Sequence, residues 1–278
     1  MNVSVFGLGY VGTVCSACLA HMGHNVVGVD LNETKVDLMS RGHAPIVERD
    51  VAEYVADAVS GGRLRATLDV EEAARETDLS LICVGTPSRP NGSLDTRAVE
   101  GVARQIGRAI ARKNTYHSVV VRSTVLPGTV RGRVLPILES ESGGRAGERF
   151  GLASNPEFMR EGTAVTDFYD PPKTVIGEVD PETAERLVAL YDGLPGPVFR
   201  TSLEIAEMAK YADNVWHALK DKQGWRAVRL GAAAAAIPAD FATLRNIVQQ
   251  DWVDAMMAEQ RSAAVREMAA KYSIEFPK

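Results

Sequence analysis

Several features that define other classes of protein are scarce or absent in this sequence of 278 residues. No apolar run approaches the roughly 18 residues that a membrane span needs. No cluster of basic residues marks a nucleic-acid surface, and the net charge of −5 also disfavours nucleic acid as a partner. The N-terminus, MNVSVFGLGYVG, has neither the basic segment nor the cleavage site of a secretory signal. We therefore expect a cytoplasmic protein without a membrane span.

Cysteine is scarce too, with only Cys15, Cys18 and Cys83 in the chain. The first two form a C-x-x-C, but no second Cys/His pair follows at the spacing of a zinc site. Both lie in a predicted helix, where small apolar side chains pack well. We predict that they belong to the core and that the protein holds no metal.

What is present is an alternation of short apolar runs with helix-like segments, which predicts an α/β fold with a Rossmann-like, doubly wound parallel sheet. Strands are predicted at 2–7, 25–30, 65–69, 79–85, 117–124, 150–154, 173–179 and 197–201. Helices are predicted after the first strand and at 33–41, 49–60, 95–112, 128–140, 181–192 and 202–219. The segment 139–147, ESESGGRAG, is predicted to be a surface loop.

The motif GLGYVG places Gly7, Gly9 and Gly12 directly after the first strand, at the start of a helix. In this G-x-G-x-x-G pattern the first glycine permits a tight turn, the second admits a pyrophosphate and the third packs helix on strand. Asp30 closes the second strand, where a carboxylate can accept hydrogen bonds from the adenosine ribose. The motif predicts a dinucleotide site, and Asp30 favours NAD over NADP because a 2′-phosphate would meet a like charge.

Two later strands end in hydroxyl side chains, at Thr86 and at Ser123 with Thr124. Ligands of open α/β sheets bind beyond the carboxyl ends of the strands, so both groups are predicted to face the cofactor crevice. Either group could instead be a helix cap, and Thr124 lies before LPGT, a sequence typical of a helix start.

Further polar residues recur at helical spacing. Glu157 and Glu161 would share one face if their segment is helical, as general base or water-positioning groups or merely as a solvated helix start. In the helix at 202–219 a stripe is formed by Glu207, Lys210, Asn214 and His217. Such a stripe offers donors to an oxyanion or a phosphate, although a solvated face would look the same.

Together these motifs resemble the UDP-glucose/GDP-mannose 6-dehydrogenase family over residues 1 to about 220. The resemblance is carried by SVFGLGYVGTVCSACLAHMGHNVVGVD, PIVE, LICVGTPSRPNGSLD, VVVRSTVLPGT, SNPEFMREGTAVTDF and EMAKYADNVWHALK. ICVGTPSRPNGSLD and DPPKTVIGEVD are closer to the GDP-mannose branch than to the UDP-glucose branch. These enzymes use NAD to oxidise the C6 alcohol of a nucleotide sugar to a carboxylate. The resemblance therefore implies a nucleotide sugar as substrate, GDP-mannose first and UDP-glucose next, in polysaccharide precursor synthesis.

Site roles follow from the resemblance. It assigns NAD contacts to Tyr10, Val11, Asp30, Lys35, Thr86 and Thr124, beside Gly7, Gly9 and Gly12 of the motif. It assigns substrate binding or catalysis to Glu157, Glu161, Lys210, Asn214 and His217, with Thr124. Glu161 would act on the hydrolytic water, and Lys210 would stabilise the oxyanion at C6. Asn214 and Thr124 would hold the reacting oxygen and an ordered water.

The family pattern also implies a later cysteine nucleophile and a second α/β domain, but this sequence has no cysteine after Cys83. We expect a Rossmann-like domain at 1–200, the start of a central helix at 201–220 and a divergent helical tail at 221–278, with the family's second domain absent. The resemblance also implies a homodimer through the central helix. We expect impaired oxidation, or a non-catalytic NAD-binding or regulatory paralogue that pairs with a full-length relative. A third alternative is an unrelated dehydrogenase that uses Lys210 for a single oxidation.

Overall fold

The computed structural model describes residues 1–91 and 93–221, with side chains as far as residue 214. The chain divides into two units, Met1–Asn214 and Val215–Lys278. The predicted helical tail at 221–278 lies outside the described residues except for its first residue, which ends a helix, and so does the side chain of His217.

The first unit is built on one eight-stranded sheet with the order β3-β2-β1-β4-β5-β6-β7-β8. The strands are β1 (Asn2–Phe6), β2 (Asn25–Val29), β3 (Leu64–Thr67), β4 (Leu79–Ile82), β5 (His117–Val121), β6 (Phe150–Ser154), β7 (Thr174–Glu178) and β8 (Val198–Thr201). All eight predicted strands are confirmed. The order reverses between β1 and β4, which is where open α/β sheets bind their ligands.

The sheet is parallel as predicted, except where β6 meets β7. The register pairs Ala153 with Glu178 and Ser154 with Gly177 in antiparallel fashion. The connection between these strands holds only a short helix, and it returns the chain to the edge at which β6 ended. As a result the amino end of β7 lies beside the carboxyl ends of the parallel strands, and this places residues before β7 at the ligand edge.

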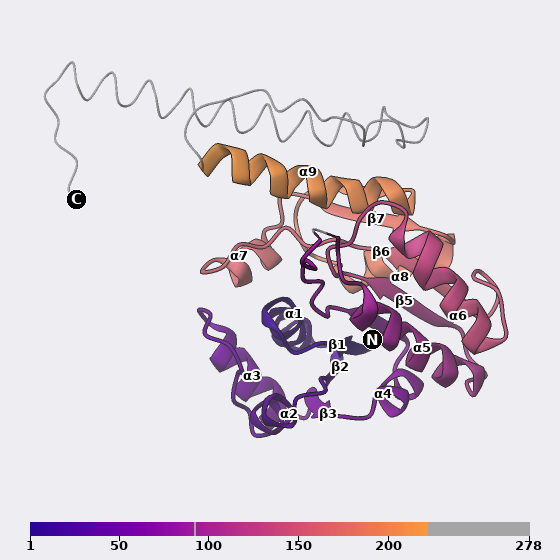
Figure 1. Ribbon diagram of the computed structural model, residues 1–278. Helices are drawn as coiled ribbons and strands as arrows, with labels where there is room; N and C mark the ends of the chain where they lie inside the picture. Colours follow the sequence, from indigo (N-terminus) through magenta and orange to yellow (C-terminus); the bar gives the residue numbers. More distant parts are fainter. Residues whose placement is uncertain (92, 222–278) are drawn as a thin grey trace, which may run out of the picture. The chain divides into compact units, whose positions relative to one another are not determined.

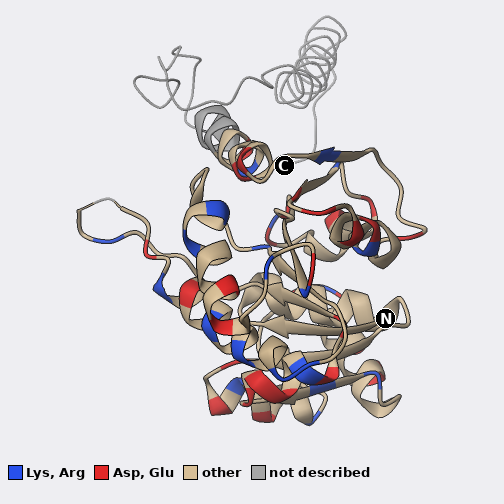
Figure 2. Ribbon diagram, turned by 90° about the vertical axis from the view of Figure 1, so that its right-hand side faces the viewer, with Lys and Arg blue, Asp and Glu red and all other residues tan. Residues whose placement is uncertain are grey.

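Helices cover both faces of the sheet (Figure 1). One apolar cluster joins the sheet to α1 (Tyr10–His21), α2 (Glu33–Ser40), α3 (Val51–Ser60), α7 (Ala164–Tyr169) and α8 (Pro181–Leu190). The other joins it to α4 (Val70–Glu76), α5 (Arg97–Ala111), the π-helical turn η1 (Val130–Val134) and α6 (Leu135–Ser142). Strands β4, β5 and β6 are buried at every position, because both faces are covered. In Figure 2 the parts of the ribbon coloured for charged residues lie mainly on helices and loops.

The predicted helices are present, and two more were not predicted. Helix α4 is short, and Asp69 caps it by accepting from the backbone N–H of Glu72 at 2.9 Å. Helix α7 is shorter still, and neither shows a long amphipathic pattern. The predicted loop at 139–147 begins later than expected, since α6 runs to Ser142 and ends at Gly143 in the left-handed region. Helix α9 (Leu203–Asp221) closes the described part, in which no helix has the length and apolar character of a membrane span.

Cys15 and Cys18 are fully buried in α1, as the packing interpretation predicted, and Cys83 is buried after β4.

Candidate dinucleotide and substrate site

The turn between β1 and α1 is set by two glycines that tolerate no side chain. Gly7 has a φ of +100°, and a Cβ there would lie 3.0 Å from the carbonyl oxygen of Cys83. A Cβ on Gly12 would lie 1.7 Å from the carbonyl oxygen of Gly7, which is well inside van der Waals contact. The predicted roles of these glycines, a tight turn and close helix packing, match this geometry.

Gly9 differs because a Cβ there would meet no atom within 4 Å. It is the N-cap of α1, and no side chain caps the first turn, which also lacks an acidic residue. Within the described part of the chain, the backbone N–H groups of Tyr10 and Val11 at the start of this helix have no hydrogen-bond partner. Unsatisfied amides at a helix N-terminus attract a phosphate through direct hydrogen bonds and the helix dipole. This end of α1 fits the pyrophosphate of a dinucleotide.

Asp30 follows β2 and is tied to the same turn. Its Oδ2 accepts from the backbone N–H of Leu8 at 2.7 Å, and its Oδ1 accepts from the backbone N–H of Asn32 at 2.9 Å. Lys35 lies 3.4 Å from Oδ2 in an ion pair. The carboxylate is thus held still beside the glycine turn, and the predicted neighbours Asp30 and Lys35 are brought together.

Thr86 and Thr124 also lie together, at the ends of β4 and β5. The Thr86 hydroxyl donates to the carbonyl oxygen of Thr124 at 2.7 Å, and the Ser123 hydroxyl donates to that of Val84 at 2.6 Å. Within the described part of the chain, the Thr124 hydroxyl has no hydrogen-bond partner of its own. The helix-cap alternative for Thr124 is wrong, because the helical segment begins at Val130.

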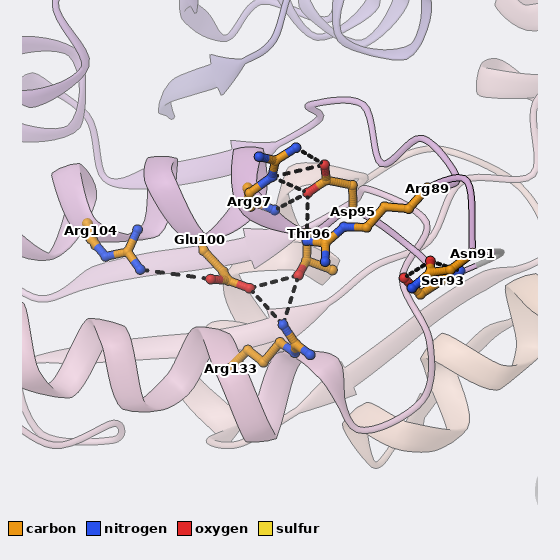
Figure 3. A network of polar contacts seen from close by, with 9 residues as sticks. All are labelled: Arg89, Asn91, Ser93, Asp95, Thr96, Arg97, Glu100, Arg104 and Arg133. Carbon is orange, nitrogen blue, oxygen red and sulfur yellow. Dashed lines mark hydrogen bonds and ion pairs between the residues drawn. The ribbon is translucent and has the colours of Figure 1, made fainter.

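The chain after Thr86 forms a hairpin closed by a bridge between Ser88 and Leu94. Its base is held by a network of ion pairs (Figure 3). The network joins Asp95 to Arg89 and Arg97, and Glu100 to Arg104, Arg133 and the Thr96 hydroxyl. The arginines of this network are exposed to solvent, so their ion pairs hold the hairpin but contribute little to the stability of the fold.

Glu157 and Glu161 do not share a helix face, which corrects the helical interpretation. Residues 155–160 are irregular, and 161–163 form a turn. The sequence before them, SNP, holds a proline that disfavours helix for the residue before it. Glu157 is largely buried and pairs with Lys210 at 2.9 Å, while its second oxygen accepts from the backbone N–H of Met159 at 2.7 Å. Glu161 is exposed.

The turn that carries Glu161 is held against the start of α1. The backbone N–H of Gly162 donates to Glu48 at 2.8 Å and to the Tyr10 hydroxyl at 3.2 Å, and that hydroxyl donates to Glu48. Burial and the hydrogen bond to Glu48 raise the pKa of Tyr10 to about 12. Glu48 was missed as a site residue, although PIVE was among the motifs of the resemblance. Its role depends on contacts far along the chain that spacing does not show.

The residues of the polar stripe on α9 differ in their burial and in their partners. Glu207 and Lys210 are 2% and 7% exposed, so the solvated-face alternative is wrong for both. Lys210 reaches Glu157, whereas Glu207 accepts from the backbone N–H groups of Gly128 and Val130. Asn214 is exposed one turn further along. Of the stripe residues with described side chains, two are buried charged groups, Glu207 and Lys210, and one is the exposed amide of Asn214.

A second buried lysine joins Lys210 because β7 is antiparallel. Continuing the β6–β7 register places Lys173 beside Phe158, and its ammonium lies 4.3 Å from the centre of that ring. The ammonium of Lys210 lies 5.6 Å from the same ring centre. Lys173 also pairs with Asp213 at 3.2 Å. Sequence reasoning missed Lys173, which only the strand direction brings to this edge.

Arg122 holds together the segments that surround Lys173 and Glu157. It is buried after β5 and donates to Asn155 Oδ1 at 2.6 Å and to the Tyr191 hydroxyl at 2.9 Å. Asn155 in turn donates to the carbonyl oxygen of Val175 at 2.8 Å. These bonds tie the ends of β5, β6 and α8 to β7. A pocket here is lined by Arg122, Asn155, Glu157, Phe158, Lys173 and Tyr191, among others.

A glycine turn at an uncapped helix and an acidic residue after β2, both at the ligand edge of a doubly wound sheet, define the class of the protein as a dinucleotide-binding α/β domain. Residues 1–194 match the UDP-glucose/GDP-mannose dehydrogenase family, NAD binding domain, and the chain belongs to this family. Its cofactor is NAD.

The relatives and solved structures agree with this assignment. GDP-mannose 6-dehydrogenase of Pseudomonas syringae pv. tomato is 50% identical over 251 residues, which are 90% of this chain and 57% of that protein. UDP-glucose 6-dehydrogenase of Haloferax volcanii is 42% identical over 225 residues, 79% of this chain and 52% of that protein. The crystal structure of a ternary complex of GDP-mannose dehydrogenase from Pseudomonas aeruginosa superposes with a TM-score of 0.79 at 51% identity, covering 80% of this chain and 51% of that one. The chain thus spans about half the length of the curated relatives it matches.

Proposed function

We propose that this chain takes part in the NAD-dependent oxidation of the C6 alcohol of a nucleotide sugar, in the synthesis of a polysaccharide precursor. GDP-mannose is the preferred substrate and UDP-glucose the next, because the GDP-mannose relative above is more similar than the UDP-glucose one. The observation that carries the proposal is the buried Lys210–Glu157 pair at the same sheet edge as the open end of α1. A dinucleotide-binding module without chemistry has no need for a buried ammonium there.

The cofactor end is assigned from the turn outward. The amides at the start of α1, including those of Tyr10 and Val11, would hold the pyrophosphate, and Gly9 leaves room for it. Asp30 and Lys35 would hold the adenosine ribose. Thr86 and Thr124 would line the crevice between β4 and β5. NAD, when bound, supplies the hydride acceptor.

The substrate end is assigned to the residues around α9. The Lys210 ammonium would stabilise negative charge on the C6 oxygen, since fixed positive charge in a dry site is worth far more than in water. Glu157 offsets the cost of burying that ammonium. Thr124 and Asn214 would hold the reacting oxygen and an ordered water.

The remaining contacts belong to water and to the nucleotide sugar. Glu161 would position or deprotonate a water, and Glu157, Lys210 and Asn214 would contact the substrate. The resemblance also assigns His217 to the substrate, but its side chain lies outside the described residues.

We further propose that this chain alone performs at most the first oxidation, in which the C6 hydrogen leaves as a hydride and the hydroxyl proton goes to solvent. The resemblance assigns the second oxidation to a cysteine, and Cys15, Cys18 and Cys83 are all buried in the dinucleotide-binding part. The proposed division is a domain at 1–200, a central helix from 201 and a divergent segment at 221–278, with a homodimer through the central helix. A non-catalytic NAD-binding or regulatory paralogue that pairs with a full-length relative is the second candidate, favoured by the burial of all three cysteines.

The deciding experiment measures NADH formed per molecule of GDP-mannose by the full chain, with UDP-glucose in parallel and NAD binding measured separately. One NADH per sugar, with an aldehyde product, supports the proposal. Two per sugar would mean that the second oxidation also occurs. NAD binding without any NADH would favour the non-catalytic alternative. The variant Lys210→Ala should lose turnover and keep NAD affinity, since it lies away from the glycine turn.

A further inference from the structure

Glu207 lies on α9 one turn before Lys210, but its side chain serves a different loop. Its carboxylate is 2% exposed, with Oε2 accepting from the backbone N–H of Gly128 at 2.6 Å and Oε1 from that of Val130 at 2.8 Å. Both oxygens are thus used on the connection between β5 and η1. This connection carries Thr124. Helix α9 therefore contacts the loop after β5 through Glu207 and the loop after β6 through Lys210.

The Thr124 loop, residues 124–130, is held by a different kind of contact at each end. At its start, hydroxyl groups of Ser123 and Thr86 fix the backbone with neutral hydrogen bonds. At its end, Glu207 makes the charged contact, beside Gly128 at a φ of +87°. The loop itself has no ionisable side chain. The hydrogen bonds of its far end to α9 therefore depend on whether one carboxyl group is ionised. The buried Val130 side chain and the Arg131–Glu204 pair that follows do not depend on Glu207.

We propose that Glu207 is a positioning residue whose ionised carboxylate fixes the Thr124 loop, so that NAD affinity depends on the ionisation of Glu207. The NAD part of this inference rests on the proposed function, whereas the loop part does not. An ionised carboxylate accepts at both oxygens. A protonated one presents an O–H to one of the two N–H groups, which then loses its acceptor.

The surroundings bring this ionisation close to neutral pH. Burial raises the pKa of Glu207 to about 7, against the hydrogen bonds from Val130 and Gly128 that lower it. Glu204 on α9 raises the pKa further by like charge, and Arg131 on η1 lowers it. These two charged groups also pair with each other. The loop should therefore loosen as the pH falls through about 7.

The first test is hydrogen exchange by mass spectrometry on the full chain, for peptides that cover 122–131, at pH 8 and pH 6 with correction for intrinsic exchange. We expect about tenfold less protection at pH 6 in the unmodified protein, the loss of one charged hydrogen bond. Glu207→Gln should show the lower protection at both pH values. Peptides from 102–110 of α5 should be unaffected and serve as the internal control.

Glu204→Gln is the matched control variant, because it removes a neighbouring carboxylate that pairs with the Arg131 side chain on η1 and accepts from no backbone amide of residues 124–130. It should keep full protection at pH 8, and its transition should move to lower pH because a like charge beside Glu207 is gone. If this variant loosened the loop as much as Glu207→Gln does at pH 8, general loss of negative charge would explain the effect and the proposal would be wrong.

The second test is the dissociation constant for NAD at the same two pH values. The unmodified protein should bind about tenfold more weakly at pH 6, and Glu207→Gln should bind weakly at both. Equal protection and equal NAD affinity in Glu207→Gln and the unmodified protein would overturn the proposal. If the variant does not fold, a flat pH profile of the unmodified protein does so instead. If no protein binds NAD at either pH, the proposed function fails, and hydrogen exchange still decides whether Glu207 holds the loop.

Discussion

The two ends of the candidate site are built in opposite ways. At the dinucleotide end, backbone amides and three glycines from one short stretch make an open turn, and no ionisable side chain within that stretch is buried. At the α9 end, charged side chains from distant segments meet in the interior, as Lys210 does with Glu157. The dinucleotide end depends on glycines, which have no side chain to fill the turn. The α9 end depends on buried charges that must be paired with opposite charges.

This difference predicts different failures. A change in the glycine turn acts through steric overlap, so its cost depends on the space at each position. A change at the α9 end leaves a buried partner uncompensated, so its cost depends on burial and charge. At the dinucleotide end, variants can therefore separate an effect on stability from an effect on NAD binding. At the α9 end, they can separate the loss of one charge of the pair from the loss of both.

The largest effect is expected from Gly12→Ala. The new Cβ would lie 1.7 Å from the Gly7 carbonyl oxygen, so α1 must move away from β1. We expect a loss of at least about 3 kcal/mol in the free energy of unfolding, measured by urea denaturation, and NAD binding weakened beyond about 100-fold.

Gly9→Ala is the matched control for that variant, because its Cβ meets no protein atom and its φ of −78° suits alanine. Stability should change by less than about 0.5 kcal/mol, while NAD binding still weakens because the methyl group occupies space left for the pyrophosphate. Unchanged NAD affinity in Gly9→Ala would show that the open space is not the phosphate site.

The two ends also differ in how far the sequence predicts them. The glycine turn is local: its residues are adjacent in the chain, and their spacing alone indicates the strand, the turn and the helix. Asp30 and the strands after it follow from the same alternating pattern. The central strands β4, β5 and β6 were predictable for this reason, since a strand covered on both faces is a continuous apolar run. The partly buried strands β3 and β8 have shorter apolar runs.

The α9 end could not be predicted in the same way. Glu157 and Glu161 were assigned to a helix face by their spacing, yet Glu157 pairs across the fold with Lys210. Lys173 reaches the site only because β7 runs antiparallel, which the alternating pattern does not show. Pairing between residues far apart in sequence is fixed by strand direction and burial, so spacing carries little information about it.

Lys210→Ala should give the second largest effect, at the α9 end. It leaves the Glu157 carboxylate buried without its partner, and breaking a buried ion pair on one side costs about 3 kcal/mol. The measurement is again urea denaturation, with NAD binding as the readout that should not change.

The double variant Lys210→Met with Glu157→Gln sharpens this result. It replaces both charges, so most of the lost stability should return although turnover should not. If the double variant were as unstable as Lys210→Ala, packing of the lysine stem rather than charge would explain the loss.

A third effect concerns the pH dependence of stability through Glu207, and its sign is unusual for a carboxylate. Its folded pKa of about 7 lies above the ordinary value, so between about pH 4.3 and 7 the folded state binds a proton that the unfolded state does not. The free energy of complete unfolding therefore increases as the pH falls from 8 to 5, by about 2 kcal/mol, because unfolding carries the carboxylate into water. Loosening of the Thr124 loop has the opposite sign, because it removes only the amide hydrogen bonds that lower the pKa of Glu207. The measurement compares the free energy of unfolding of the unmodified protein with that of Glu207→Gln at each pH. A difference between the two that is independent of pH would contradict this sign.

The smallest effect is expected outside both ends, in the ion-pair network at the base of the hairpin (Figure 3). The Thr96 hydroxyl, followed by Arg133 and Arg104, holds the pKa of Glu100 below its ordinary value. Its contribution is therefore present above about pH 4.3 and is lost as the pH falls, the opposite sign to Glu207. Glu100→Gln should cost only about 0.5 kcal/mol at low salt, because Arg133 is 61% exposed and its side chain must be ordered to pair. In 0.5 M salt the difference in urea denaturation should almost vanish, since exposed charges are screened over a few ångströms at that concentration. A loss of about 2 kcal/mol that persists at high salt would place this network with the buried charges of α9 rather than with the surface.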